Sequence, residues 1–518
     1  MIENLAVGFS ASLSPENLLW CLIGVVVGTV IGMLPGLGAT TGIAILIPLT
    51  LGMDPLTALI MLAGIYYGCQ YGSTISAVLI ATPGDANAVS TVIDGYAMAR
   101  NGRAGAALAI SAIGSFVAAI VSVVLLATLA GPIADLAIGF GPAENFAIMV
   151  FAMATIVAFS GADIRKGLMM AGLGIALSTV GVAMGFTTAR FTGGSVNLLG
   201  GLDFVVVMIG IFAIGEVLSQ ISAGGAEPIR ARFRDMLITR KELRQASPAI
   251  ARGTGIGFVF GSLPGAGSTL ASFLAYGVEK SVSKTPERFG KGAIQGVAAP
   301  ESANNSAANA NFIPTLSLGI PGGSTTAVLL GAFIMYGVQP GPLLFTEQPT
   351  LVWGLITSFF IGNVILLVLN LPLAPAFAQI LRLPYNHLYP FIIFFSLIGA
   401  FAVAGNTFGL IVVLVASALG FCLKKFGYPS APLILGLVLG PMTEKALVQT
   451  SAFGRGDLSI LLQSPVAMTI LILAVVLAAA PILSRSLRER ARRKRDLETA
   501  AEASAAEREP DHDSQPSR

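Results

Sequence analysis

Three long segments of the chain contain no lysine or arginine, namely residues 1–99, 104–164 and 292–381. A soluble protein carries charged side chains over its whole surface, whereas the hydrocarbon core of a bilayer excludes them. Only 11% of all residues are charged, 54% are hydrophobic, and the mean hydropathy is +0.81. This pattern excludes ordinary soluble domains. It predicts an all-α polytopic membrane protein that has the lipid bilayer as a partner.

About a dozen apolar segments are long enough to cross or enter a bilayer. The chain also contains 60 glycines and 28 prolines, which membrane helices tolerate where neighbouring groups satisfy the freed backbone. Several segments are therefore expected to be short or broken helices. The predicted segments are residues 18–34, 41–51, 57–82, 104–131, 141–160, 166–186, 203–222, 253–278, 312–338, 351–377, 388–421, 431–440 and 465–483.

The distribution of charge divides the chain into five expected regions. The N-terminus lacks the basic start of a cleavable signal peptide, so its first apolar segment is expected to remain in the mature protein. The composition is consistent with insertion into a bacterial inner membrane. The regions are a periplasmic N-terminus (1–17), a first membrane repeat (18–223), a cytoplasmic basic linker (224–252), a second membrane repeat with C-terminal spans (253–483) and a disordered cytoplasmic tail (484–518).

Two parts of the sequence match each other without a gap. Residues 24–40 and 253–269 both contain three glycines spaced four residues apart, followed by Leu-Pro-Gly-x-Gly-x-Thr. A second pair follows later in each half, Thr-Pro-Gly-Asp at 82–85 and Ile-Pro-Gly-Gly at 320–323. These matches predict an internal duplication.

Basic residues near membrane segments mark the cytoplasmic side. The second signature is flanked by basic clusters on both sides, at 230–252 and 280–291, so a hairpin that enters and leaves on the cytoplasmic side is expected. The first signature has basic-free flanks, and the same hairpin would enter from outside. This arrangement predicts inverted-topology repeats, which in secondary transporters place substrate and ion sites near the midplane.

Each signature is suited to binding an anion. Proline ends one half-helix, glycines allow a tight turn, and the next half-helix presents free N–H groups and the positive end of its dipole. The competing interpretation, which the sequence leaves open, is that these residues only form kinks and packing faces. The predicted substrate-binding residues are Gly36, Gly38, Thr40, Ser73, Thr82, Gly84, Gly265, Gly267, Ser268, Thr269, Gly322, Gly323, Ser324 and Thr325.

An amide-rich run at 301–311 precedes the last of these motifs. Amides at membrane depth need partners, so a polar cavity or a coordinated ion is expected, with a surface loop as the alternative. The candidate residues for a coupling ion are Asp85, Glu301, Asn304, Asn305, Asn309 and Asn311. Both carboxylates are alternatively interpreted as helix caps or interface groups.

Six segments form a specific combination of motifs, at 32–40, 71–73, 82–85, 94–96 (Asp-Gly-Tyr), 300–305 (Pro-Glu-Ser-Ala-Asn-Asn) and 337–342 (Gly-Val-Gln-Pro-Gly-Pro). At these residues the chain closely resembles the TctA family, the large membrane subunit of tripartite tricarboxylate transporters, and the resemblance covers about residues 18–440. That resemblance implies uptake of carboxylates driven by an ion gradient, with a small TctB-like membrane subunit and a periplasmic TctC-like binding protein as partners.

Other functions are less consistent with the sequence. The chain has no Gly-x-x-x-x-Gly-Lys-Ser/Thr phosphate-binding loop, so an ATP-driven permease would need a separate ATPase docked at the 224–252 linker. A membrane-embedded hydrolase would need paired acidic or histidine ligands, and the sequence contains no such set at sensible spacing. We therefore expect no catalytic residues, no cofactor, no metal other than sodium and no nucleic-acid partner. Sodium or protons are the expected coupling ions.

Overall fold

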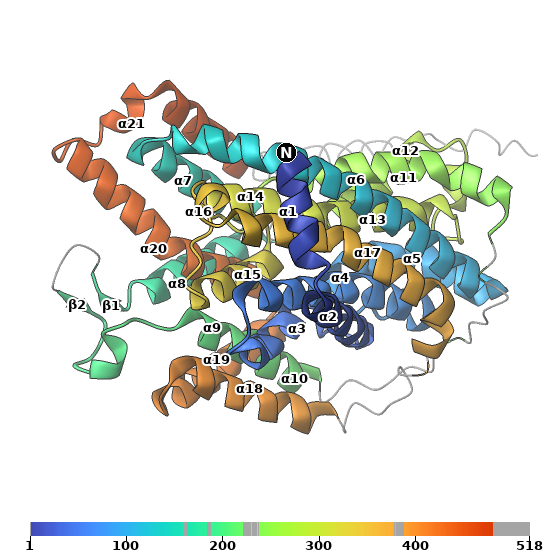
Figure 1. Cartoon of the computed structure of the whole chain (residues 1–518), viewed down its shortest axis with the longest axis horizontal. Helices are drawn as coiled ribbons and strands as arrows, with labels where there is room; N and C mark the ends of the chain where they lie inside the picture. The colour runs from blue at the N-terminus through green and yellow to red at the C-terminus, as the bar shows by residue number, and fades with distance from the viewer. Residues whose placement is uncertain are drawn as a thin grey trace, which may run out of the picture.

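The computed structural model describes residues 2–158, 163–183, 188–220, 229, 236, 238–377, 379 and 388–479, and these residues are predominantly helical (Figure 1). The elements of the first half are α1 (Ile2–Ser12), α2 (Pro15–Met33), α3 (Gly38–Leu46), η1 (Ile47–Thr50), α4 (Pro55–Ile80), η2 (Ala86–Ala88), α5 (Val89–Met98), η3 (Ala99–Arg103), α6 (Ala104–Ile138), α7 (Pro142–Ala158), α8 (Ile164–Ser178), β1 (Gly181–Val182), β2 (Ala189–Arg190), η4 (Val196–Leu198), α9 (Phe204–Met208), η5 (Ile209–Ile214) and α10 (Gly215–Gln220). Strands β1 and β2 form a short antiparallel pair.

The second half begins at the helix that carries the repeated signature. Its elements are α11 (Arg240–Gly261), α12 (Gly267–Val282), η7 (Pro286–Arg288), α13 (Gln295–Ala310), α14 (Phe312–Leu318), α15 (Ser324–Met335), α16 (Leu344–Glu347), α17 (Pro349–Phe377), α18 (Leu388–Ala404), α19 (Phe408–Lys425), α20 (Ser430–Phe453) and α21 (Ile460–Gln463). The predicted tail at 484–518 lies outside the described residues.

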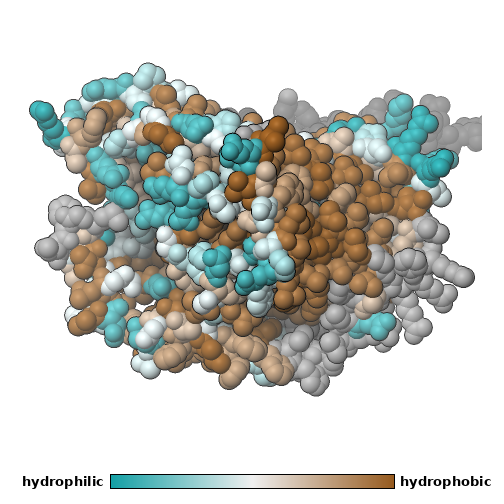
Figure 2. Space-filling model, viewed as in Figure 1, coloured by the Kyte–Doolittle hydropathy of each residue, from teal (hydrophilic) through white to brown (hydrophobic). Residues whose placement is uncertain are grey.

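Five helical stretches among the described residues are long and apolar enough to cross a membrane. They are Pro15–Met33, Ala86–Ile138, Pro349–Leu369, Phe408–Lys425 and Ser430–Phe453. Shorter apolar helices accompany them, as the interrupted segments of the sequence predicted. Figure 2 shows a broad hydrophobic face over the side where α6 and α17 lie in Figure 1. The chain is therefore a multi-pass helical membrane protein, which confirms the coarse fold prediction.

Both signatures interrupt a helix at the same place. In the first half α2 ends at Met33 and α3 starts at Gly38, and in the second half α11 ends at Gly261 and α12 starts at Gly267. The glycines of the two turns match in conformation, because Gly36 and Gly265 both have φ of 78°, and Gly38 and Gly267 have φ of 51° and 67°. L-residues with a side chain rarely adopt these angles. The turns therefore require glycine.

The glycines before each break are packing residues. Those of α2 lie against the backbone of α4, and those of α11 lie against the backbone of α13, so closely that an added Cβ would collide. This close approach is the small-residue packing that membrane helices use. The matched contacts are Gly24 with Met61, Gly28 with Ile65, Gly32 with Cys69, Gly253 with Ala299, Gly257 with Ala303 and Gly261 with Ala307.

The amide-rich run forms a buried helix, so the alternative of a surface loop is wrong. Every residue from Gly296 to Ala310 in α13 is buried. The apolar segments predicted from the sequence do not include this helix, because its asparagines, serines and glutamate lower its hydropathy. These polar side chains are stable in the interior because neighbouring helices supply many of their hydrogen-bond partners.

The two halves are interleaved. Helix α3 of the first half packs against α15 of the second, and α12 of the second half packs against η2 of the first. Likewise α6 packs against α13, and α17 packs against α4. The broken turns of both halves are thereby brought together in the interior.

Three basic segments lie close together at one end of the helices. Arg103 forms an ion pair with Glu242 near the start of α11, and the Asn101 side chain donates to the backbone carbonyl of Lys291. The segment at 100–103 therefore lies beside both 240–252 and 280–291. Much of the predicted linker, including Arg234, lies outside the described residues, and α11 begins at Arg240.

Candidate functional site

The first half-helix end is already occupied by a carboxylate of the chain itself. Asp85 Oδ2 accepts a hydrogen bond of 2.9 Å from the backbone N–H of Ala39, in the first turn of α3. Asp85 is held in turn by Ser73, whose Oγ accepts from the Asp85 backbone N–H at 2.7 Å. A negative side chain here satisfies a free N–H group and complements the helix dipole. This geometry matches the interpretation of Asp85 as a helix-cap carboxylate.

The two broken turns of the second half also contact each other, but through backbone groups and without a carboxylate. The Gly265 N–H donates to the carbonyl oxygen of Gly322 at 2.9 Å. A Cβ placed on Gly323 would lie 3.5 Å from the Cα of Gly267. The predicted residues Gly265, Gly267, Gly322 and Gly323 are thus brought together at the start of α12.

Hydroxyl groups join the two halves at their broken turns. Thr40, at the start of α3, has its Oγ1 2.9 Å from Thr325 Oγ1 and 3.3 Å from Ser324 Oγ. The latter two residues open α15. Helix starts from both halves therefore meet at a contact made of small polar side chains.

A buried aromatic residue connects this region to the amide-rich helix. Tyr66 of α4 accepts from Asn311 Nδ2 at 3.3 Å and also interacts with the side chains of Ser268 and Gln70. Tyr66 and Asn311 are 1% and 2% exposed. Asn311 also packs against Gly322 and Gly323, so it lies beside the start of α12.

Glu301 lies in a second polar cluster, within a cage of hydroxyl groups. Its carboxylate oxygens accept from Thr74 Oγ1 at 2.7 Å, Thr91 Oγ1 at 2.5 Å and Ser111 Oγ at 3.2 Å. The side chain is completely buried. These donors come from α4, α5 and α6, so a residue of the second half is enclosed by helices of the first. Oxygen-rich surroundings of this kind suit a proton or a hard cation.

The asparagines after Glu301 extend this cluster along α13. Asn305 Nδ2 donates to Ser115 Oγ at 2.7 Å, and Asn309 Nδ2 donates to Ser122 Oγ at 2.9 Å. Asn304 is fully buried, and neither polar atom of its side chain has a partner within the described part of the chain. A buried amide without partners is costly, so Asn304 is a candidate contact for an ion or a substrate.

Not every predicted residue joins these clusters. Thr82 is exposed, and its hydroxyl donates to the carbonyl of Ile80 at 3.2 Å. Gly36 shapes the first turn, and Gly84 packs against the backbone of Gly32. Thr269 is half-buried in the first turn of α12.

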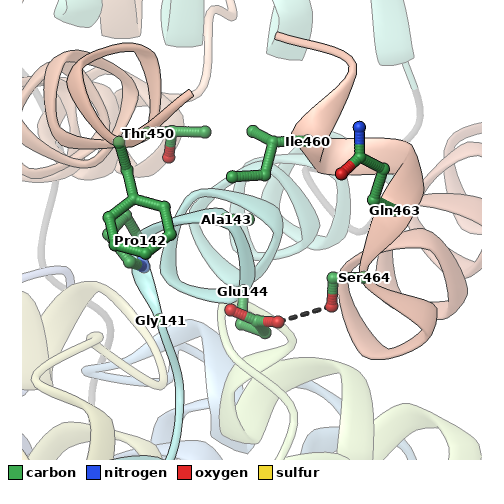
Figure 3. A pocket seen from close by; sticks show the side chains of 9 residues that line it. Gly141, Pro142, Ala143, Glu144, Thr450, Ile460, Gln463 and Ser464 are labelled. Carbon is green, nitrogen blue, oxygen red and sulfur yellow. Dashed lines mark hydrogen bonds between the residues drawn. The ribbon is translucent and has the colours of Figure 1, made fainter. Parts of the chain in front are cut away.

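A pocket of about 290 Å³ lies elsewhere, between α7, α20 and α21 (Figure 3). Its lining includes Glu144 and Ser464, which hydrogen-bond to each other. None of the predicted site residues lines it, so it does not belong to the candidate site.

Sequence reasoning missed the role of Asp94, which appeared only within a family motif. Its Oδ1 accepts from the backbone N–H groups of Gly290, Gly292 and Ala293 at 2.9, 2.8 and 2.8 Å. Its Oδ2 accepts from the Tyr276 hydroxyl at 2.9 Å. Asp94 thus anchors the loop that leads into α13. Ser111, Ser115 and Ser122 were also missed, although their helical spacing in an otherwise apolar helix is a usable signal.

Comparison with known proteins identifies the family of the chain. The model of the tripartite tricarboxylate transporter TctA family matches residues 18–435. The chain belongs to this family. The TctA resemblance predicted from the motifs is thereby confirmed, and this TctA protein is a membrane component of a tripartite tricarboxylate transporter.

Two relatives from Agrobacterium vitis are similar to this TctA protein. An uncharacterized 52.8 kDa protein in the TAR-I ttuC′ 3′ region is 42% identical over 494 residues, which cover 95% of this chain and 98% of that protein. An uncharacterized protein in the TAR-II ttuC′ 3′ region is 45% identical over 236 residues, which cover 45% of this chain and 97% of that protein. No solved structure matches the chain.

Proposed function

We propose that this TctA protein carries out ion-gradient-driven uptake of organic carboxylates across the bacterial inner membrane. In this proposal a periplasmic TctC-like protein delivers the substrate, a small TctB-like membrane subunit completes the transporter, and the C-terminus is cytoplasmic. The observation that carries the proposal is the contact of Thr40 with Ser324 and Thr325, where helix starts from both halves meet. Helix N-termini and hydroxyl groups are suited to binding carboxylates without a buried lysine or arginine.

The matched elements favour an inverted repeat as the transport machinery. The φ angles of Gly36 and Gly265 agree, and the glycine faces of α2 and α11 pack in the same way against the following long helices. Basic residues flank the two signatures differently, which supports opposite orientations of the halves. In transporters built this way, one repeat or bundle moves against the other around a central site.

Coupling to a cation follows from the electrical work of transport. Each negative charge moved into a cell with a negative interior costs about 2.3 kcal/mol per 100 mV. A dianion alone therefore needs a compensating supply of energy, which entry of sodium or protons provides. We assign the coupling role to Glu301 rather than Asp85, because the Asp85 carboxylate is engaged at the start of α3.

The test is uptake by the complete transporter, reconstituted in proteoliposomes with its small subunit and its binding protein, using radiolabelled citrate, succinate and malate. Accumulation of at least one of these acids should depend on an inward sodium or proton gradient and proceed without ATP. Accumulation that survives collapse of both gradients, or that requires ATP, would contradict the proposal.

A further inference from the structure

The two matched broken turns differ in charge at one position. Where the first half has Asp85, the second half has Gly323. The backbone is extended at both residues, with φ and ψ of −129° and 151° at Asp85 and −168° and −178° at Gly323. The position is therefore similar in conformation, but only the first half supplies a carboxylate.

This difference leaves the two half-helix ends in different states. Gly38 and Ala39 at the start of α3 are buried, and a Cβ on Gly38 would lie 3.0 Å from Asp85 Oδ2. Gly267 and Ser268 at the start of α12 are only half-buried, and a Cβ on Gly267 would meet no atom within 4 Å. The first end is thus closed by a carboxylate, whereas the second has open space beside it.

A buried side chain without a complete set of partners points to a ligand at the second end. Asn311 is 2% exposed, its Oδ1 has no hydrogen-bond partner among the described residues, and its Nδ2 would lie 3.7 Å from a Cβ on Gly323. The Nδ2 group carries two hydrogens and donates one of them to Tyr66, so the other can donate to an anion beside Gly323. Asn311 therefore borders the space that a carboxylate at position 323 would enter.

We propose that the start of α12 is the subsite for a substrate carboxylate, and that the start of α3 is not. This inference rests on the proposed function and assigns the binding of a substrate carboxylate to one of the two predicted half-helix ends. A substrate carboxylate takes on α12 the place that Asp85 takes on α3. Its oxygen accepts from the backbone N–H of Ser268, which matches Ala39 in the repeat, while Asn311 donates from the side. Asp85 is an internal example of the same contact.

The test is to supply the missing carboxylate from the chain itself. Gly323→Asp places a carboxylate beside α12, and the extended backbone and ordinary contact distances at this position accommodate the side chain. Gly277→Asp is the matched control, because it adds a carboxylate to α12 at an exposed position outside the proposed site, where a Cβ would meet no atom within 4 Å. Both variants are compared with the wild type in the complete reconstituted transporter, using whichever of citrate, succinate and malate the wild type accumulates.

Gly323→Asp should lose uptake to background, whereas Gly277→Asp should keep most of it. The purified Gly323→Asp protein should melt at or above the wild-type temperature, and added substrate should no longer raise its melting temperature. A lowered melting temperature would overturn the inference, because the inserted carboxylate would then not fit the helix end. Wild-type uptake by Gly323→Asp, or equal loss in both variants, would overturn it as well. If the wild type accumulates none of the three acids, the proposed function itself fails.

Discussion

The Oγ1 atoms of Thr40 and Thr325 lie 2.9 Å apart, although the residues belong to different halves of the chain. One opens the half-helix α3 and the other lies in the first turn of α15. The N–H group of Ala39 in α3 is already bonded to Asp85, so the polar groups at this contact are the hydroxyls of both halves. A carboxylate bound between the halves would therefore meet polar groups from each of them, and movement of one half would change the site.

The first prediction concerns this hydroxyl contact. Thr40→Val keeps the shape of the side chain but removes its hydroxyl, which leaves Thr325 and Ser324 without their partner. A lost hydrogen bond in a buried site costs about 1–3 kcal/mol, so kcat/KM for uptake should fall about tenfold or more. Thr82→Val is the control, because Thr82 is exposed and should tolerate the change. Equal effects of the two substitutions would show that the Thr40 contact has no special role.

The second prediction concerns coupling at Glu301. Glu301→Gln keeps the size of the side chain but removes its negative charge and its ability to carry a proton. Gradient-driven accumulation should be lost, while exchange of labelled for unlabelled substrate, which needs no net ion movement, should persist. The measurement compares uptake with exchange in the same proteoliposomes. Retention of gradient-driven accumulation would exclude Glu301 as the coupling group.

The broken turns could be predicted from the sequence because their causes are local. Proline removes a backbone donor and the following glycines adopt positive φ angles, so the interruption follows from residues 34–38 and 263–267 alone. The repeat made this prediction stronger. In contrast, α13 was missed as a buried helix because hydropathy measures transfer from water and does not include partners on other helices.

The partners of the polar residues could not be predicted, because they depend on contacts between distant segments. Glu301 meets Thr74, which is 227 residues away in the sequence. The difference between Asp85 and Gly323 is visible in the aligned motifs. What this difference implies for binding can be inferred only from the structure, because the contact of Asp85 with Ala39 shows that the start of α3 is occupied.

The third prediction concerns stability. Asp94→Asn removes the negative charge. Its –NH2 group either replaces the oxygen that accepts from Tyr276 or faces the N–H donors of the 290–293 loop. Because hydrogen bonds to a charged group contribute about 1.5–3 kcal/mol each, the free energy of unfolding should fall by about 3 kcal/mol or more. Tyr276→Phe removes one donor and should have a smaller effect. Thermal unfolding of the purified variants checks this order, and a reversed order would contradict the anchoring role of Asp94.

The fourth prediction concerns orientation in the membrane. Cysteines placed at Arg100 and Lys284 should be labelled only from the cytoplasm, and cysteines within 339–350 only from the periplasm. Arg234 and Met1, outside the described residues, are predicted to be cytoplasmic and periplasmic. The native cysteines Cys21, Cys69 and Cys422 are first replaced, because Cys422 is exposed. Labelling at Lys284 from the periplasm would contradict the proposed hairpin.

The fifth prediction concerns the glycines that begin the two half-helices. Gly38→Val and Gly267→Val both force a β-branched residue into a positive φ angle, which costs about 1–3 kcal/mol. Gly38→Val also presses against the Asp85 carboxylate, whereas Gly267→Val fills the open space at the start of α12. Both should abolish uptake, but only the Gly38 variant should also lower the melting temperature strongly.

Gly277 supplies the matched control for these two variants. It lies within α12, its φ angle is helical, and an added Cβ would meet no atom within 4 Å. Gly277→Val should therefore insert into the membrane and transport substrate almost normally. Normal transport by Gly267→Val would contradict the proposed carboxylate contact at α12, and normal transport by Gly38→Val would show that the turn before α3 tolerates a side chain. Loss of transport in Gly277→Val as well would point to general sensitivity of α12 rather than to its first turn.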